Sequence, residues 1–260
     1  MPDDAELKKM YVDDYFSPDG CCRPTTPGGY LDKEDLIRSE AVGLLKYLGD
    51  RRGRFLEIGC AGGFFLDEAR AAGFDVMGIE GNSSMARHAR EKLGLPVDNR
   101  SVFDVHFEPG SFDVVASNRV LEHLPPIHET LKKIASWLRP GGLLLISGPL
   151  EDTARGDLWW HANRLRGHSP TPIQEPPYHV HGFTRASWGH LMRRSGFRML
   201  NLRVNPDSMH LGVHSAKDLL AWPLEIAGWV GDRVSGRGSF MISLAEVMPQ
   251  ERDAAKVPPA

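Results

Sequence analysis

The 260-residue sequence has only three cysteines, and it has no long apolar run. Cys21, Cys22 and Cys60 are too few for a disulfide framework, which favours a reducing compartment. The first ten residues lack both a cationic start and an apolar stretch, and no segment reaches the roughly 20 apolar residues of a membrane span. We therefore expect a cytoplasmic protein with no secretory signal and no bilayer-crossing helix.

An excess of one charge is also missing. The chain carries 31 Lys and Arg against 34 Asp and Glu, a net charge of -3, whereas a nucleic-acid-binding surface usually needs a clear basic excess. Hydrophobic residues make up 41% of the chain, which is enough for a sizeable core. These values favour a globular domain with no nucleic-acid partner.

From Arg54 onward, short apolar runs alternate with helix-length segments. The strand-like runs are 55–58, 75–79, 112–117 and 143–147, followed later by a helix over 184–195 and strands over 197–204 and 239–247. The early runs show little polar alternation, which is typical of parallel strands covered on both faces. The pattern predicts an α/β fold with a doubly wound, mostly parallel sheet and right-handed crossovers.

Several segments do not follow this alternation of strands and helices. Residues 1–50 are acidic, with a helical pattern from Lys33, and are predicted to form an N-terminal helical flap. The domain itself is predicted over 51–250, with insertions at 150–182, which shows no clear strand, and at 205–237; residues 251–260 read as a flexible tail. We expect the flap and both insertions to form a substrate cover.

A glycine-rich turn joins the first strand to the next helix. In a doubly wound sheet, this turn lies at the ligand crevice. The dinucleotide pattern G-x-G-x-x-G starting at Gly59 would need glycine at positions occupied by Ala61 and Phe64, and no P-loop sequence occurs. The turn therefore favours a ligand held without a phosphate cradle, with a plain structural turn as the alternative.

These residues resemble the class I S-adenosylmethionine-dependent methyltransferases. The family's first motif, [ED]-x-G-x-G-x-G, corresponds to Glu57, Gly59, Ala61 and Gly63, with Ala61 as the one departure. Further matches in the family's order are Glu80 after the second strand, Asp104, the run 112–124 and the turn 138–142. Each acid alone is more often an ordinary strand-end residue, so the argument depends on their combination.

The resemblance implies a Rossmann-like, seven-stranded sheet with an antiparallel last strand, and S-adenosylmethionine as the cofactor. The residues expected to contact it are Glu57, Gly59, Cys60, Ala61, Gly62, Glu80, Gly81, Asn82, Phe103, Asp104, Asn118 and Arg119, with Tyr15 and Tyr30 from the flap. In the family, the acid at Glu80 binds the ribose hydroxyls and the acid at Asp104 receives the adenine amino group. Backbone groups at 59–62 and at Asn118 are expected to hold the methionine portion.

Histidines are the candidates for a general base if the methyl acceptor is a hydroxyl. We single out His181 and His123, although a loop histidine is more often structural. His179 and His181 also suggest a metal pair, but no third ligand is evident at metal spacing, so no metal is expected.

The expected reaction is methyl transfer to a small molecule or glycan, at oxygen. Two alternatives remain: a lipid or polyprenyl-linked acceptor at the membrane surface, and a catalytically silent cofactor-binding protein. The apolar segment 219–230 supports the lipid alternative. For this segment, a lid is favoured over a dimer contact or a membrane-surface helix. Pro223 should interrupt its helix, and Asp218, Glu225 and Asp232 make its polar face acidic. The oligomeric state stays open.

Overall fold

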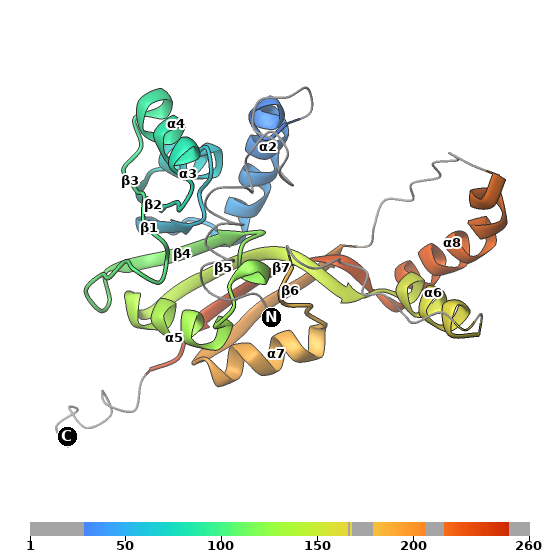
Figure 1. Ribbon diagram of the computed structural model, residues 1–260. Coiled ribbons are helices and arrows are strands. Elements are labelled where there is room, and N and C mark those ends of the chain that lie inside the picture. Colours follow the sequence, from blue (N-terminus) through green and yellow to red (C-terminus); the bar gives the residue numbers. More distant parts are fainter. Residues whose placement is uncertain (1–28, 166, 168–178, 206–215, 250–260) are drawn as a thin grey trace, which may run out of the picture.

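The computed structural model describes residues 29–165, 167, 179–205 and 216–249 (Figure 1). Tyr15 and the predicted tail over 251–260 lie outside the described residues. In the described part of the chain, no helix has the length and apolarity needed to cross a membrane.

Seven strands form one sheet in the order β3-β2-β1-β4-β5-β7-β6. Their bounds are β1 Gly53–Ile58, β2 Phe74–Ile79, β3 Val97–Asp98, β4 Phe112–Asn118, β5 Leu138–Asp152, β6 Phe197–Asn205 and β7 Gly238–Val247. All neighbouring pairs are parallel except those of β7, which runs antiparallel to both β5 and β6. The predicted seven-stranded sheet with an antiparallel last strand is confirmed, and the two-residue β3 is the one strand that the apolar pattern did not indicate.

Helices cover both faces of the sheet. The α-helices are α2 Glu34–Leu45, α3 Phe64–Ala71, α4 Ser83–Leu93, α5 Ile127–Trp137, α6 Ala154–Leu165, α7 Arg185–Arg194 and α8 Ala216–Ser235. Figure 1 shows α2, α3 and α4 on one side of the sheet and α5 and α7 on the other. Two buried clusters match these layers, one around Leu44 and Leu66 and one around Leu131 and Trp188. Both faces of the parallel strands are therefore shielded from water by helices, which explains their uninterrupted apolar runs.

Trp188 anchors α7 to the sheet. Its side chain is fully buried, and its Nε1 donates a hydrogen bond of 3.0 Å to the Ser243 hydroxyl of β7. Trp188→Phe should lower the free energy of unfolding by about 1 to 2 kcal/mol, because the buried hydroxyl loses its donor. Urea unfolding measures this loss, and adding Ser243→Ala should recover part of it. Equal destabilisation in the single and double variants would show that lost packing volume, and not the hydrogen bond, is responsible.

The two predicted insertions both contain helices. The first holds the end of β5 and then α6, and the second holds α8, which continues through Pro223 where we predicted an interruption. Proline removes one backbone donor, and the remaining turns of this 20-residue helix continue around the gap. Asp232 is buried and accepts a hydrogen bond from the Ala154 N–H, so its assignment to a solvated acidic face is wrong.

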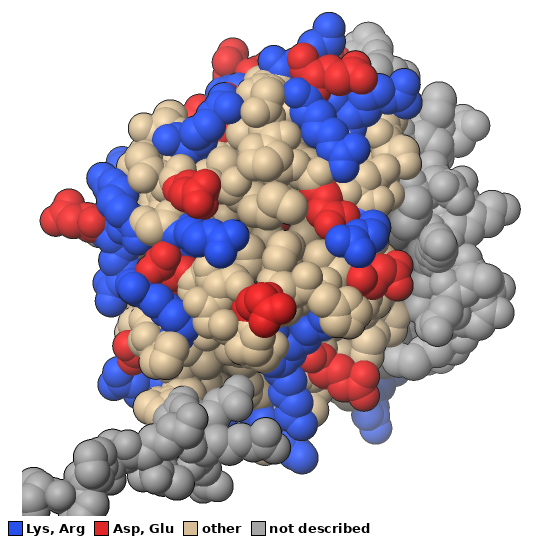
Figure 2. Space-filling model, turned by 90° about the vertical axis from the view of Figure 1, so that its left-hand side faces the viewer, with Lys and Arg blue, Asp and Glu red and all other residues tan. Residues whose placement is uncertain are grey.

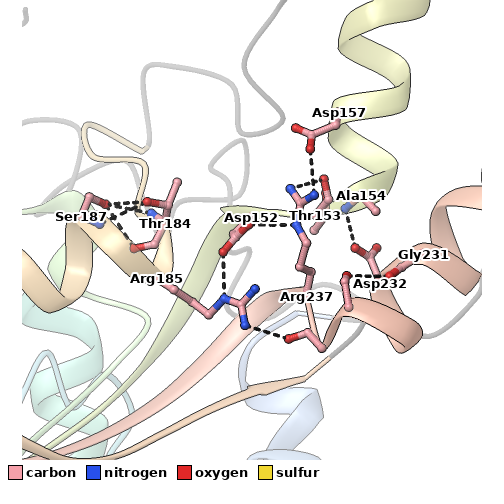
Figure 3. Close-up of polar contacts among 12 residues, drawn as sticks. Asp152, Thr153, Ala154, Asp157, Thr184, Arg185, Ser187, Gly231, Asp232 and Arg237 are labelled. Atoms are coloured by element: carbon pink, nitrogen blue, oxygen red, sulfur yellow. Dashed lines mark hydrogen bonds and ion pairs between the residues drawn. The ribbon is translucent and has the colours of Figure 1, made fainter.

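A group of ion pairs joins α6, α7 and the turn after α8 to the end of β5 (Figure 3). The Asp152 carboxylate accepts hydrogen bonds from Nε of Arg185 and Nε of Arg237, both at 2.9 Å. Arg237 also reaches Asp157 at 2.8 Å and the Thr153 carbonyl at 3.0 Å. Burial alone would raise the pKa of Asp152, but the two arginines outweigh it and hold that pKa below its usual value. The carboxylate is therefore charged at neutral pH and keeps its ion pairs with Arg185 and Arg237.

Candidate active site

The candidate site lies where the strand order reverses, between β1 and β4. The carboxyl ends of these strands are aligned, since Ile58 pairs with Ile79 of β2 and with Ser117 of β4. In open α/β sheets, ligands bind at this switch point. The loops after β1 and β4 touch: a Cβ placed on Gly59 would lie 2.5 Å from Cγ2 of Val120. Glycine at position 59 therefore lets the two loops meet.

The loop after β1 is shaped by its own backbone hydrogen bonds. The N–H groups of Gly59 and Cys60 both donate to the Ile79 carbonyl, at 2.8 and 3.1 Å. Gly59 has φ of 69°, and Ala61 has φ of 46°, which is unusual for a residue with a Cβ. We expected backbone groups of 59–62 to hold the methionine portion, but the N–H groups of Gly59, Cys60 and Ala61 are already paired within the protein. A ligand would meet the loop's α-carbons and remaining carbonyl groups.

Glu80 follows β2 with its carboxylate buried and held at both oxygens. Oε2 accepts from the Ala61 N–H at 2.8 Å, and Oε1 accepts from the Asn82 N–H at 2.7 Å. Asn82 also caps the start of α4, and the Asn99 side chain donates to the carbonyls of Glu80 and Gly81. Burial raises the pKa of Glu80, and its two backbone hydrogen bonds counter this effect. Each oxygen keeps a second lone pair, so the group can accept from two adjacent hydroxyls.

Glu57 and Tyr30 lie beside this carboxylate. Glu57 is buried, and its Oε2 has no hydrogen-bond partner among the described residues. Burial, followed by the charge of Glu80, raises the pKa of Glu57 well above its usual value. The Tyr30 ring stacks on Phe64 at 5.7 Å, and its Cε1 would lie 3.1 Å from a Cβ on Gly62. Tyr30 thus covers the glycine-rich turn.

The Cys60 side chain points away from the crevice. It is buried, and its Sγ would lie 2.7 Å from a Cβ on Gly78 of β2. Burial raises the pKa of this thiol well above its usual value, which keeps it protonated and unreactive at neutral pH. Of the predicted cofactor-binding residues, Cys60 can therefore offer only backbone atoms.

Phe103 and Asp104 lie on the loop after β3. Phe103 is 41% exposed although its side chain is large and apolar. Lys133 of α5 donates hydrogen bonds from Nζ to the carbonyls of Val102 and Phe103, at 3.0 and 2.8 Å. Our sequence reasoning missed Lys133, because nothing in the helix pattern of α5 marks a lysine that reaches back to this loop. Lys133 thereby holds in place the backbone that carries the Phe103 ring and the Asp104 carboxylate.

Asn118 and Arg119 form the turn after β4. Asn118 Oδ1 accepts a hydrogen bond of 2.5 Å from the Ser147 hydroxyl, and the Arg119 N–H donates to the Ser147 carbonyl at 2.8 Å. Arg119 has φ of 55°, the second non-glycine residue with positive φ among those described. Its guanidinium lies 3.6 Å from the Glu40 carboxylate and over the Phe240 ring. Backbone strain of this kind is common at functional sites.

These features fit S-adenosylmethionine. Glu80 offers two oxygens to a diol, Phe103 offers an exposed apolar surface to an adenine ring, and the glycines at 59 and 62 let Val120 and Tyr30 pack closely against the loop after β1. The orphaned Oε2 of Glu57 is a buried acceptor near the same loop. These residues could hold the cofactor with protein atoms alone.

The two candidate bases, His123 and His181, lie on segments that are joined by backbone hydrogen bonds from Val180 and His181 to Glu122. His181 Nε2 lies 3.0 Å from the Leu124 carbonyl and 2.9 Å from the Pro125 carbonyl, so this nitrogen carries the proton and donates. Only Nδ1 of His181 is left to accept a proton. His123 is buried, and its ring lies 4.9 Å from that of His179. His123 is more buried than His181, and it stays a candidate.

Residues 34–202 match a family described as a methyltransferase domain, and this match covers more than half of the chain. The chain belongs to this family. The resemblance to class I S-adenosylmethionine-dependent methyltransferases is thereby confirmed, as is their fold.

Known proteins agree with this assignment. A ubiquinone biosynthesis O-methyltransferase of Paramagnetospirillum magneticum is 35% identical over 94 residues, which are 35% of this chain and 38% of that enzyme. The chain thus matches about two fifths of the length of the first curated relatives. An S-adenosylmethionine-dependent methyltransferase of Archaeoglobus fulgidus has a TM-score of 0.58 at 14% identity, covering 84% of this chain and 98% of the other.

A second solved structure carries a ligand. It is phosphoethanolamine N-methyltransferase 2 of Haemonchus contortus, in complex with phosphomonomethylethanolamine and S-adenosylhomocysteine. Its TM-score is 0.55 at 18% identity, covering 91% of this chain and 56% of the other. At such identities the solved structures show the fold alone.

Proposed function

We propose that this chain transfers the methyl group of S-adenosylmethionine to an oxygen atom of a small molecule. The observation that carries the cofactor assignment is the buried Glu80 carboxylate, fixed at both oxygens beside the glycine-rich turn. The relatives named as O-methyltransferases, and the neighbour with bound S-adenosylhomocysteine, support the reaction and the cofactor. A cytoplasmic location and a small-molecule acceptor belong to the same proposal.

The residues divide the work by position. Glu80 would receive the ribose hydroxyls, Asp104 the adenine amino group, and Phe103 the face of the adenine ring. Glu57, Gly59, Gly62, Gly81, Asn82, Asn118 and Arg119 would line the remainder of the cofactor site, with Tyr30 above it. When bound, the cofactor supplies an activated methyl group, so the main task of the protein is to place the acceptor oxygen in line with it. His123 or His181 would take the acceptor proton.

The charges on one face of the protein bear on the choice between a small acceptor and a nucleic acid. On the face in Figure 2, basic and acidic side chains are interspersed, and neither sign forms a continuous patch. Phosphate backbones are usually met by clustered Lys and Arg. We keep as part of the proposal the prediction, made from the net charge, that the protein has no nucleic-acid partner.

A lipid or polyprenyl-linked acceptor is the second candidate. Large apolar side chains are exposed on the two added helices: Leu165 of α6 is 90% exposed, and Val230 and Val234 of α8 are 45% and 84% exposed. The start of α6 at Ala154 contacts α8 at Gly231 and Asp232, so Leu165 at the other end of α6 is set apart from Val230 and Val234, and an apolar partner would meet these side chains at separate points. Contact of the 219–230 segment with a membrane surface remains a prediction.

A methyl-transfer screen separates these functions. Protein is incubated with S-adenosylmethionine carrying a labelled methyl group and with phenols, sugars, amines, or a polyprenyl alcohol in micelles. We expect label in a phenol or sugar hydroxyl. Label in the polyprenyl alcohol alone would establish the second candidate, and label in an amine would contradict transfer to oxygen. Binding of S-adenosylhomocysteine with no transfer to any acceptor would indicate a catalytically silent protein.

A further inference from the structure

Three potential metal ligands come together beside the candidate active site. Glu122, His123 and His179 each offer one ligand atom, and these atoms all lie within 4.8 Å of one another. It is the one such group found in the described part of the chain. Sequence reasoning paired His179 with His181 and found no third ligand, but the fold pairs His179 with two residues from the turn after β4.

The backbone holds this group in place. The segment carrying His179 is fastened to the β4 turn, because the N–H groups of Val180 and His181 both donate to the Glu122 carbonyl, at 3.0 and 3.1 Å. The His181 side chain adds the two hydrogen bonds to the Leu124 and Pro125 carbonyls described above. These contacts fix the position of the residue just before them, His179, against His123. Small side-chain rotations would then bring the three ligand atoms to a common ion.

The carboxylate of Glu122 is unusually placed for a structural residue. Glu122 is only 3% exposed, and it lies over Gly148 of β5, where a Cβ would be 3.5 Å from its Oε2. The guanidinium of Arg119, whose charge acts on Glu122, lies 3.6 Å from the carboxylate of Glu40. A buried carboxylate is costly without a cationic partner. A bound cation would remove that cost.

The ligand chemistry selects a class of ion. Two imidazoles and one carboxylate form the donor set of many divalent zinc, manganese, iron and cobalt sites, which leave positions open for a further ligand. A histidine ligand must be neutral, so binding of the ion should weaken as the pH falls. One carboxylate and a divalent ion leave a net positive charge, which suits an oxygen that is losing its proton.

We propose that Glu122, His123 and His179 bind one divalent transition-metal ion that receives the acceptor oxygen. With His123 bound to the ion, His181 would be the remaining candidate for the general base. The location supports this: Val120, two residues before Glu122, touches the glycine-rich turn, so the ion would lie at the carboxyl ends of β4 and β5, on the acceptor side of the cofactor site. Metal binding itself needs only these three residues. The role at the acceptor oxygen rests on the proposed function.

Equilibrium dialysis of the full chain against Zn²⁺, followed by metal analysis, tests the site without any methyl acceptor. All proteins carry Cys21→Ser and Cys22→Ser, so that thiols do not bind the ion. We expect one Zn²⁺ per chain, with affinity lowered roughly 100-fold or more by Glu122→Gln or His179→Ala, since loss of even an indirect partner costs 10- to 100-fold. His190→Ala, which removes an exposed histidine of α7, is the matched control and should bind as the parent does.

Two further measurements keep the outcome clear. Thermal unfolding identifies a variant that fails to fold, and the visible spectrum of bound Co²⁺ reports nitrogen ligands in the parent. A folded parent that binds no ion, or one that binds Zn²⁺ equally well in Glu122→Gln and His179→Ala, would overturn the proposal. S-adenosylhomocysteine binding is measured on the same samples: if it persists while the ion fails to bind, only the metal site is wrong.

Discussion

Replacing Glu80 by alanine should weaken S-adenosylmethionine binding by about 1 to 3 kcal/mol, or roughly 5- to 150-fold. The carboxylate would lose both hydrogen bonds to the ribose, and these are charge-assisted. The backbone N–H groups of Ala61 and Asn82 would also lose their acceptor, so the glycine-rich turn would lose part of its support. Calorimetric titration measures the affinity.

Glu80→Gln separates these effects. The amide keeps one oxygen acceptor but loses the charge, so its affinity should fall between those of the parent and Glu80→Ala. Because burial raises the pKa of Glu80, binding in the parent should strengthen as the pH rises through that pKa and the carboxylate ionises, whereas Glu80→Gln should show a flatter profile. Identical affinities in all three proteins would mean that Glu80 is an ordinary strand-end residue.

Replacing Gly59 by alanine should lower the free energy of unfolding by about 2 to 5 kcal/mol. The added Cβ would meet a φ of 69°, which costs an L-residue about 1 to 2 kcal/mol, and the close approach to Val120 adds about 1 to 3 kcal/mol of overpacking. Cofactor affinity should fall with it, because the turn would shift. Urea unfolding and calorimetric titration measure the two losses.

A double variant checks the reason. Val120→Ala removes the methyl groups that the new Cβ would strike, so Gly59→Ala with Val120→Ala should be less destabilised than the sum of the two single changes. The backbone strain would remain. If the two losses of stability simply add, the contact between the two loops is unimportant. Glycine would then not be needed at position 59 for their close approach.

The sequence was most informative where structure is local. The runs at 55–58 and 75–79 predicted β1 and β2 because strands buried on both faces leave a continuous apolar pattern. Glu80 was predicted to lie at a strand end because it directly follows the apolar run 75–79 in the sequence. Thr184 was predicted to start a helix, and its hydroxyl does accept the Ser187 N–H at the start of α7.

Contacts between distant segments were the ones that sequence reasoning missed. Glu122 and His179 are separated by two helices in sequence, and nothing in the spacing of the histidines indicates that backbone hydrogen bonds bring them together. The signal available was the pair Glu122-His123 directly after a parallel strand, where ligand-binding residues gather. The helix α6 was missed because its tryptophans and histidine give no clear apolar stripe.

We propose above all that the site at the carboxyl ends of β1 and β4 binds S-adenosylmethionine through protein atoms. Calorimetric titration of the purified chain with S-adenosylhomocysteine, without added metal, and in parallel with NADH, tests it most directly. We predict saturable binding of one S-adenosylhomocysteine per chain and none of NADH, because Phe64 stands where a dinucleotide turn needs glycine. Binding of NADH at micromolar concentration, with no binding of S-adenosylhomocysteine, would contradict the account.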